Sequence, residues 1–455
     1  MRDRQSIHGS WASRGTFILA ATGASVGLGN IWKFPYIAGE NGGGAFVLVY
    51  LVCVALVGIP IMMAEVLLGR RGRQSPTATF RELALEVGST RRWAWLGLCG
   101  VLAGVLIFGF YSVVSGWVLA YVFYAADGRF VGAGVDQVAA LFAGLLADPQ
   151  ALMIWHTLFV VVVVGVVARG VNRGLEASIR VLMPLLFVLL LLLLAYAMTS
   201  GAFAQGVDFL FNVDFSELSW NAVLVALGHA FFTLSLGMGS MMVYGSYMPK
   251  SASIGVSVLM VAALDTLIAL AAGLAIFPLV FANQLDPGAG PGLMFVTLPV
   301  AFGHMDGGQI FGFLFFSMVA IAAWSSAISL LEPVVAYVVE RFEITRAAAC
   351  MILGCVVWLL GMGALASFNV GSQWSLFGLS FFNLLDFLTA SVLLPLGGLL
   401  ICVFAGWWVG RRITREELSL RSEWVFNGWF FLVRYVAPVA VAIVFIANLW
   451  QKITA

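Results

Sequence analysis

Apolar segments of about twenty residues recur along the whole chain, and this repetition constrains the fold more than any other feature. About 20 helical residues cross the ~30 Å hydrocarbon core of a bilayer. Only 10% of the 455 residues are charged and 62% are hydrophobic, which lies far outside the range of soluble domains. We therefore predict an all-α polytopic membrane protein. Its eleven predicted spans lie in segments 13–38, 43–68, 93–125, 152–168, 176–199, 219–247, 253–282, 310–340, 346–365, 375–405 and 429–452.

The positive charges are distributed asymmetrically about these spans. Of the 23 Lys and Arg residues, 20 fall in the N-terminal tail, in the even-numbered connections or at the start of the last span. Only Arg129 and Lys452 fall on the other side, and Lys33 lies within span one. Because such charges concentrate on the cytoplasmic side, we predict a cytoplasmic N-terminus and, with an odd number of spans, Ala455 outside.

Other sequence features narrow the class of protein further. The net charge is +1 and no basic stripe is present, so no nucleic-acid partner is expected. The five cysteines lack metal-ligand spacing and are interpreted as core thiols. The first apolar segment is too long for a cleavable signal peptide and has no small-residue cleavage site.

Two predicted spans are interrupted by small and polar residues. Span one contains GASVGLGN at 23–30, and span six contains FFTLSLGMG at 231–239. Non-helical backbone at membrane depth persists only where it is buried in protein or lines a cavity. Broken spans in matching positions of two five-span halves indicate an inverted-repeat transporter with a site near the midplane. The alternative is close helix packing, since Gly23 and Gly27 form a GxxxG pattern.

Four carboxylates fall inside predicted spans, where ionisable groups are costly and are functional candidates by default. They are Glu65, Asp265, Glu332 and Asp386. His229 precedes Thr233 by one helical turn on the same face of span six, and its alternative interpretation is a core histidine.

Hydroxyl groups cluster in span eight, at Ser325, Ser326 and Ser329. Such hydroxyls either bond back to their own helix or, together with carbonyls freed by an unwound helix, supply oxygen ligands to a cation such as sodium. Tyr111 in span three offers a phenol to an anionic group, or is an interfacial aromatic.

Several motifs together resemble a known family. GLGNIWKFPY at 27–36, ENGGGAF at 40–46, FFTLSLGMG and the serine pair before LLEP are similar to the neurotransmitter:sodium symporters, and particularly to their short, eleven-helix bacterial amino acid transporters with the leucine-transporter fold. The resemblance implies one transporter domain over 1–455, with five-helix repeats at 13–200 and 219–405 and an additional helix at 429–452. It also implies a monomer or weak dimer in the lipid bilayer of a bacterial cytoplasmic (inner) membrane, with a small-molecule substrate, an amino acid.

The resemblance also implies site residues. The substrate-binding residues would be Ser25, Leu28, Gly29, Ile107, Tyr111, Phe232, Thr233, Ser235, Met238, Ser326, Ser329 and Leu330. One sodium ion would use Ser25, Asn30, Thr233 and Asp265, and a second would use Gly23, Val26, Ala322, Ser325 and Ser326. Phe232 would close over the substrate beneath a charged pair of Lys33 and Asp386.

Departures from the family pattern carry their own predictions. Lys33 stands where the family usually has arginine, so the outer gate becomes a point-charge contact. Asp265 stands where asparagine is frequent, and Ala269 where chloride-dependent members place serine. We therefore expect transport without chloride and proton counter-transport through Asp265, with His229 as a neighbour. His8 replaces an arginine, which argues against an inner-gate pairing with Glu340.

The substrate class follows from the residues implied to face it. Gly27 replaces the aspartate of the monoamine transporters, which favours an amino acid, and Ile107, Met238 and Leu330 favour a neutral hydrophobic or aromatic one. Ser326 and Ser329 leave open a small polar substrate such as glycine, alanine, taurine or GABA. A non-transporting receptor on the same fold is a further alternative. HExxH does not occur, and GxSxG occurs only as GASVG at 23–27, within the glycine-interrupted span and not on a strand-to-helix turn, so no enzyme is expected.

Two further segments are given a role. Pro184 in span five is interpreted as a point of local unwinding that opens a water path to the second sodium ion. Segment 283–308 has no Lys or Arg, is rich in Gly and Pro, and is interpreted either as an external lid or as a disordered loop.

Overall fold

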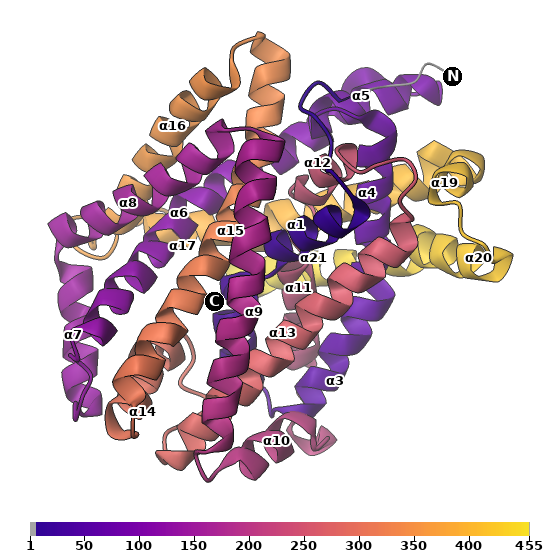
Figure 1. The fold of residues 1–455 in the computed structure, drawn as a ribbon. Coiled ribbons are helices and arrows are strands. Elements are labelled where there is room, and N and C mark those ends of the chain that lie inside the picture. The colour runs from indigo at the N-terminus through magenta and orange to yellow at the C-terminus, as the bar shows by residue number, and fades with distance from the viewer. Residues whose placement is uncertain (1–5, 455) are drawn as a thin grey trace.

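The computed structural model describes residues 6–454, and this part of the chain consists of helices and connecting loops without a β-strand (Figure 1). Arg2, Arg4 and Ala455, which entered the topology prediction, lie outside the described residues, as does the side chain of Lys452. The described α-helices are α1 (Arg14–Ser25), α2 (Phe34–Glu40), α3 (Gly44–Cys53), α4 (Ile59–Gly72), α5 (Pro76–Glu86), α6 (Ala94–Ala126), α7 (Val135–Ala147), α8 (Pro149–Ala168), α9 (Ala177–Met198), α10 (Phe203–Phe211), α11 (Trp220–Thr233), α12 (Ser240–Ser246), α13 (Ile254–Ala282), α14 (Leu298–His304), α15 (Gly308–Phe342), α16 (Arg346–Ala366), α17 (Phe381–Asp386), α18 (Leu394–Val403), α19 (Gly410–Leu418), α20 (Glu423–Phe431) and α21 (Ala437–Thr454).

Several neighbouring helices join through π-helical turns into longer rods. Within residues 6–454, nine continuous helices, either single or joined in this way, are long and apolar enough to cross a membrane. They are Gly44–Gly72, Arg91–Ala126, Pro149–Ala168, Val171–Met198, Ile254–Ala282, Gly308–Phe342, Arg346–Ala366, Phe381–Leu418 and Glu423–Gln451. They correspond to predicted spans two to five and seven to eleven. The all-helical membrane fold expected from the sequence is confirmed.

Predicted spans one and six are the two that do not form continuous helices. The first is divided into α1 and α2, which are joined by a bend and a π-helical turn at Gly29–Lys33. The second is divided into α11 and α12, with residues 234–239 unwound between them. Both divisions fall where the sequence places glycines within an apolar run.

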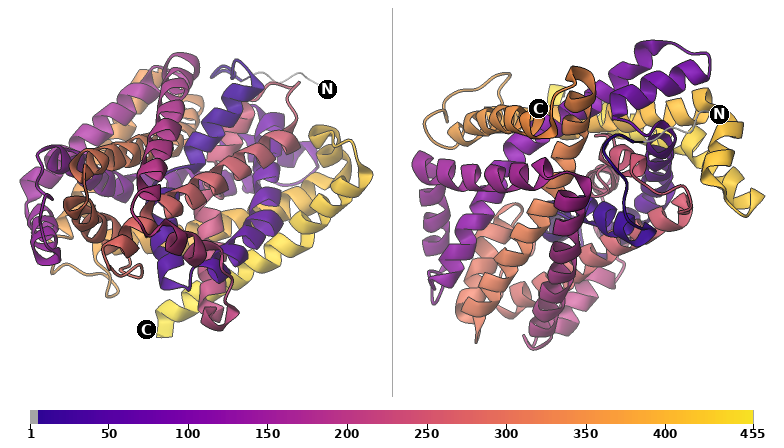
Figure 2. Two further views of the ribbon diagram at one scale, coloured as in Figure 1. Left: turned by 60° about the horizontal axis from the view of Figure 1, so that its bottom comes forward. Right: turned by 45° about the horizontal axis from the view of Figure 1, so that its top comes forward.

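The two longest helices, α6 and α15, pack against each other and form the centre of the bundle. Most side chains in the middle of α15 are buried, whereas Val181, Val188 and Leu191 of α9 are 64%, 53% and 64% exposed. In a membrane protein such outward apolar side chains face lipid. Figure 2 shows α21 running along the outer edge of the bundle.

The even-numbered connections meet at one end of the molecule, which we call the arginine-rich end. Nε of Arg70 lies 2.6 Å from Oε1 of Glu417, and Arg73 donates to the carbonyl of Met248 at 2.6 Å. Nε of Arg346 donates to the carbonyl of Val167 at 2.8 Å. These contacts join the connections after spans two, four, six, eight and ten, as the charge pattern predicts.

Segment 283–308 folds back over the bundle instead of forming a disordered loop. It contains a π-helical turn at Leu293–Thr297 followed by α14. Trp32 donates to the carbonyl of Pro291 at 3.2 Å, and the Tyr121 hydroxyl donates to the carbonyl of Phe295 at 2.9 Å. The segment therefore covers α2 and α6.

Candidate functional site

The first break leaves backbone groups of residues 26–28 without helical partners, and nearby side chains satisfy them. Asn30 Oδ1 accepts from the amide of Gly27 at 3.1 Å, and Ser326 Oγ donates to the carbonyl of Val26 at 3.1 Å. Buried backbone groups rarely remain unpaired, so these two side chains fix the course of the unwound chain. This explains why polar residues accompany the glycines.

The second break is stabilised by a buried carboxylate. Ser235, Gly237 and Gly239 have φ values of 54°, 82° and 80°, a left-handed region that glycine adopts without strain. Oε1 of Glu65, from α4, accepts from the amide of Gly237 at 2.6 Å. The sequence marks Glu65 as a functional candidate without a role, and the structure shows that it holds the unwound part of span six.

One carbonyl joins the two breaks directly. Ser235 Oγ donates to the carbonyl of Ala24 at 2.9 Å, and Ser326 Oγ lies 3.3 Å from the same oxygen. Span one, span six and span eight therefore meet at Ala24. The sequence prediction missed this residue because its contribution is a backbone atom and its side chain carries no chemical signal.

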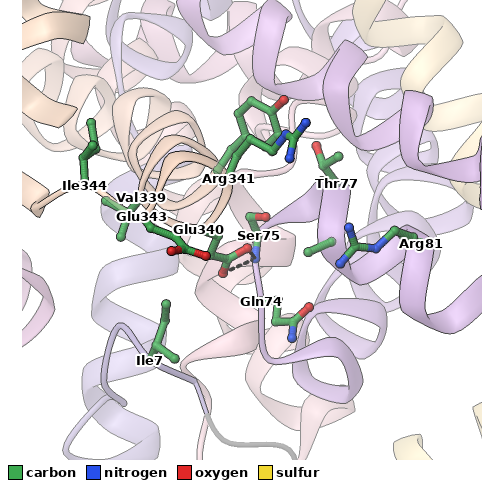
Figure 3. Close-up of a pocket in the computed structure, with 12 residues that line it drawn as sticks. Ile7, Gln74, Ser75, Thr77, Arg81, Val339, Glu340, Arg341, Glu343 and Ile344 are labelled. Carbon is green, nitrogen blue, oxygen red and sulfur yellow. Dashed lines mark hydrogen bonds between the residues drawn. The ribbon is translucent and has the colours of Figure 1, made fainter.

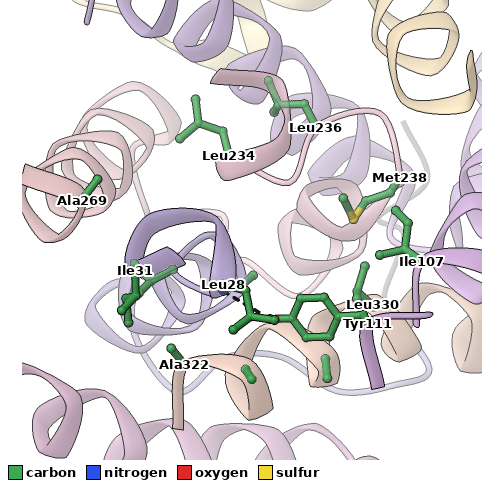
Figure 4. Close-up of a cluster of buried hydrophobic side chains, with 14 of the residues drawn as sticks. Leu28, Ile31, Ile107, Tyr111, Leu234, Leu236, Met238, Ala269, Ala322 and Leu330 are labelled. Carbon is green, nitrogen blue, oxygen red and sulfur yellow. Dashed lines mark hydrogen bonds between the residues drawn. The ribbon is translucent and has the colours of Figure 1, made fainter. Parts of the chain in front are cut away.

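A small enclosed cavity lies between the two breaks. The structure brings eleven of the twelve predicted substrate-binding residues to its wall and adds Ala24 and Gly27; Thr233 lies behind it. The wall consists of Ala24, Ser25, Gly27, Leu28, Gly29, Ile107, Tyr111, Phe232, Ser235, Met238, Ser326, Ser329 and Leu330. Figure 4 shows that Tyr111, Ile107, Met238 and Leu330 lie together beside Leu28.

The cavity has a polar end and an apolar end. At the polar end the Tyr111 hydroxyl accepts from the amide of Leu28 at 3.4 Å, so its own proton is free to be donated to a ligand. At the other end Ile107, Met238 and Leu330 present buried apolar side chains. Such an arrangement suits a molecule with an anionic group and an apolar side chain.

Gly27 is required by the close packing at the polar end. A Cβ atom at this position would lie 2.3 Å from Oγ of Ser326 and 3.1 Å from the Tyr111 hydroxyl. No side chain fits there without displacing the hydroxyl groups that line the cavity. The surroundings of position 27 therefore leave no room for an aspartate side chain.

Three of the four residues of the first predicted sodium site lie in contact around one carboxylate. Asn30 Nδ2 donates to Oδ1 of Asp265 at 2.8 Å, and Thr233 Oγ1 donates to Oδ2 at 3.1 Å. Asp265 is completely buried. Ser25, which precedes Asn30 in span one, lines the cavity wall. Thr233 and Asp265 thus bring together side-chain oxygens of the kind that a sodium ion requires, which fits the proposed site, whereas Asn30 turns Nδ2 toward Asp265 and Oδ1 toward the amide of Gly27.

The residues of the second predicted sodium site also lie together. Ser325 Oγ donates to the carbonyl of Ala322 at 3.0 Å, and Ser326 Oγ reaches the carbonyl of Val26. A Cβ built on Gly23 would lie 3.4 Å from Cβ of Ser325 and 3.0 Å from Sδ of Met183. Spans one and eight therefore present hydroxyl and carbonyl oxygens to each other, a donor set that fits sodium.

Phe232 separates this cavity from a second hollow between α2, α11 and α21. Both hollows include Phe232 in their lining, and the second also includes Lys33 and Asp386. Lys33 Nζ lies 4.6 Å from the centre of the Phe232 ring, a cation–π contact. Among the described residues no ion pair joins Lys33 to Asp386, so the predicted gate residues share a hollow without forming a salt bridge in this structure.

At the arginine-rich end His8 pairs with Glu340, contrary to the sequence argument. Nε2 of His8 lies 3.1 Å from Oε1 of Glu340, and the amide of Ser75 donates to both carboxylate oxygens at 2.8 and 3.0 Å (Figure 3). Trp11 fixes the tail at this position, because its amide donates to the carbonyl of Tyr247 at 2.9 Å. The tail backbone brings the shorter imidazole close enough to replace an arginine.

The remaining candidate residues have different environments. Glu332 accepts from the Tyr247 hydroxyl at 2.7 Å and forms an ion pair with Arg346, which is the arrangement of a structural cluster. His229 is buried between the rings of Phe34 and Tyr50, and neither of its ring nitrogens has a hydrogen-bond partner. Among the described residues no group of His, Cys, Asp and Glu has the arrangement of a metal cluster, and the five cysteines are free.

Comparisons with known proteins agree with this architecture. The model of the sodium:neurotransmitter symporter family matches residues 8–131 and 143–454. An uncharacterized sodium-dependent transporter of Bacillus subtilis is 38% identical over 96% of this chain and 96% of its own length. A second uncharacterized sodium-dependent transporter, from Haemophilus influenzae, is 32% identical over 97% of this chain and 98% of its own.

A solved structure is similar over almost the whole molecule. The crystal structure of MhsT in complex with L-phenylalanine has a TM-score of 0.89 and 44% sequence identity, and the match covers 97% of this chain and 99% of that one. The fold is therefore the leucine-transporter fold expected from the motifs. The matched family and relatives are transporters and not enzymes. This chain belongs to the sodium:neurotransmitter symporter family and is a multi-pass, sodium-dependent membrane transporter.

Proposed function

We propose that this protein imports a neutral hydrophobic or aromatic amino acid together with sodium, by alternating access to the cavity between spans one and six. The observation that carries the proposal is the cavity itself. The Tyr111 hydroxyl and the amides near Leu28 and Gly29 receive the substrate carboxylate, and the side chain lies against Ile107, Met238 and Leu330. The complex of the similar protein MhsT with L-phenylalanine supports this substrate class.

Two sodium ions accompany the substrate in this proposal. The carbonyl of Ser25, Asn30, Thr233 and Asp265 bind the first ion, and the substrate carboxylate completes its coordination. Gly23, Val26, Ala322, Ser325 and Ser326 bind the second. Each site takes residues from span one and from span six, seven or eight. Bound sodium therefore holds these spans together. Sodium binding therefore stabilises the outward-open state, and substrate binding permits closure of Phe232.

Asp265 replaces chloride as the negative charge near the first sodium ion. Its carboxylate is buried and contacts the neutral donors Asn30 and Thr233. An isolated buried carboxylate is strongly disfavoured, so a proton neutralises it when sodium leaves. This produces proton counter-transport, and the buried, unpaired imidazole of His229 in α11 is a second group that could take part.

The charge distribution supports the orientation of the protein in the membrane. We assign the arginine-rich end to the cytoplasm, which places the N-terminus inside and the C-terminus outside a bacterial cytoplasmic membrane. Lys33 and Asp386 then lie in the outer hollow above Phe232, and the His8–Glu340 pair closes the inner side.

A second substrate class is favoured by a specific feature of the cavity. Ser235, Ser326 and Ser329 all line it, and they give it three hydroxyl groups. Glycine, alanine, taurine or GABA would use these hydroxyls and the limited space. Ser329 Oγ already donates to the carbonyl of Ser326 at 2.7 Å, so its hydrogen is not available to a polar substrate. The apolar wall therefore favours an amino acid with a larger, hydrophobic side chain.

The test is uptake by purified protein in proteoliposomes. With an inward sodium gradient, labelled phenylalanine or leucine should accumulate above its external concentration, and it should not do so when potassium replaces sodium. Binding of the amino acid without accumulation would contradict symport and indicate a receptor. Stronger competition by alanine, taurine or GABA than by phenylalanine would assign the small polar class instead. A pH-sensitive dye inside the vesicles should report alkalinisation during uptake if protons move outward.

A further inference from the structure

A groove of about 350 Å³ opens between α8 and α9, on the outside of the bundle and separate from the transport site. Figure 1 shows α8 and α9 diverging from the turn that joins them, and both helices pack on α15. Trp324 and Ile328 of α15 form the floor of the groove. The apolar part of its lining is formed by Val162, Val166, Val181, Leu182, Trp324 and Ile328.

The mouth of the groove carries two arginines. Arg169 follows the last turn of α8, and Arg173 lies in the π-helical turn Val171–Glu176 before α9. Both are exposed, and neither forms an ion pair with any residue in the described part of the chain. The neighbouring cations are used differently, because Arg180 pairs with Glu176 and Arg346 with Glu332. Two positive charges are therefore available at one end of an apolar groove.

The indole of Trp324 gives the groove an aromatic floor. Nε1 of Trp324 has no hydrogen-bond partner and is shielded from solvent, although an indole N–H normally finds an acceptor when buried. The ring itself stacks on Phe159, with 6.5 Å between the ring centres. Because Nε1 is shielded, an occupant of the groove contacts the indole ring and not its N–H.

We propose that this groove binds a phospholipid with a net negative, phosphate-bearing headgroup. The headgroup lies between Arg169 and Arg173 at the arginine-rich end, and an acyl chain lies along the apolar lining. Basic pockets between transmembrane helices on this side of a membrane are suited to anionic headgroups. The groove is continuous with the lipid-facing surface of α9, where Val181 is 64% exposed, so the occupant enters from the bilayer. The eight residues from Val162 to Arg169 span about 10 Å of helix, which separates the headgroup from the middle of the acyl chain.

A lipid in this groove contacts α9, a helix that also contacts span one. Leu182 lines the groove, and its neighbour Met183, about 100° further round α9, faces Gly23 of span one. A lipid in the groove therefore supports α9 from outside at the turn that contacts span one. Binding itself does not require the protein to transport sodium or an amino acid, so its test is independent of the proposed function.

The test measures binding of dioleoylphosphatidylglycerol to purified, detergent-solubilised protein, by native mass spectrometry and by the shift of the thermal unfolding midpoint. Removing both charges in R169Q/R173Q should weaken binding about thirtyfold. Val181→Trp, which fills the groove at an exposed position, should weaken it with the arginines intact. The matched control is R412Q/R421Q, because it removes two exposed arginines from the same end at a distance from the groove.

Four outcomes would contradict the proposal, and one would support it. Equal binding by R169Q/R173Q and the native protein would overturn it, and so would an equal loss in R412Q/R421Q. Phosphatidylcholine that binds as tightly as phosphatidylglycerol would overturn the charge selection. If glycerol phosphate alone produced the same thermal shift, the site would be a simple anion site and the assignment to a lipid would be wrong. Retention of phosphatidylglycerol by the native protein and by the control, together with its loss from the other two variants, supports the lipid site.

Discussion

Nε2 of His8 lies 3.1 Å from Oε1 of Glu340, although the chain has no arginine at this position of its tail. The same carboxylate accepts from the amide of Ser75, so it links the tail, the connection before α5 and the end of α15. The tail is held in place beside Glu340, because Trp11 donates hydrogen bonds to the carbonyls of Tyr244 and Tyr247. It forms a latch over the inner side of the transport site.

Removal of the latch is expected to favour opening of the arginine-rich end. His8→Ala loses one hydrogen bond to a carboxylate, worth roughly 1–2 kcal/mol, which corresponds to about a fivefold to thirtyfold shift between closed and open states. Ser246→Cys, in a background without native cysteines, places a reporter at a position that is 1% exposed below the tail. Maleimide should label this cysteine faster in the His8→Ala variant, and His8→Arg should slow labelling.

His304→Ala is the matched control for the latch. His304 bonds only within its own helix, from Nδ1 to the carbonyl of Val300 at 2.9 Å, so labelling should not change. Equal labelling rates in His8→Ala and the native tail would show that the contact does not hold the inner side closed.

Asp265 should make transport independent of chloride. Replacement of chloride by gluconate is expected to leave uptake by the native protein unchanged, because the buried carboxylate supplies the negative charge. Asp265→Asn should raise the sodium concentration for half-maximal uptake at least about tenfold, or about 1.4 kcal/mol. Asn30 and Thr233 keep a hydrogen-bonding partner in the amide, so the protein should still fold.

The double variant D265N/A269S provides a sharper test of the same idea. Ala269 is buried one helical turn after Asp265, where serine would offer a hydroxyl to an anion. Uptake by this variant should increase with chloride, whereas Ala269→Ser alone should not respond. A large loss of native uptake in gluconate would refute the compensation by Asp265.

Gly27 should tolerate no side chain. Gly27→Ala places a methyl group 2.3 Å from Oγ of Ser326, which must then rotate away from the carbonyl of Val26. Overpacking of this kind costs about 1–3 kcal/mol, and affinity for the amino acid should fall about tenfold or more. Gly165→Ala in α8 is the control, because nothing lies within 4 Å of its added Cβ. A native KM for Gly27→Ala would contradict the proposed polar end of the cavity.

The sequence predicted the parts of this protein whose signals are chemical. The apolar spans, the glycine-broken segments and the arginine distribution each leave a pattern in residue type, and the cavity wall was predicted almost completely through the family motifs. Contributions from backbone atoms left no such pattern. The carbonyl of Ala24 and the amide of Gly237, which receives the Glu65 carboxylate, became visible only when the chain was folded.

The sequence also could not predict which of several nearby groups a side chain contacts. The family resemblance implied a charged pair of Lys33 and Asp386, but Lys33 lies over the ring of Phe232 in this structure. The replacement of the family's arginine by His8 argued against a pairing with Glu340, whereas the position of the tail backbone decides that contact. Residue type constrains which groups can pair, and the backbone decides which of them do.

Pro184 should control the release of the second sodium ion. In this structure α9 is continuous from Ala177 to Met198, and the proline removes the amide that would bond to the carbonyl of Arg180. The adjacent Met183 contacts Gly23, so opening of this turn would let water reach the candidate site. Pro184→Ala restores the missing hydrogen bond and should make the opening about 1–2 kcal/mol harder, which slows sodium release roughly tenfold. Net uptake should therefore fall while exchange of internal for external amino acid is preserved. Leu185→Ala changes an exposed neighbour without adding a hydrogen bond and should leave both rates unchanged; equal net uptake by Pro184→Ala and the native protein would sink the idea that this turn unwinds.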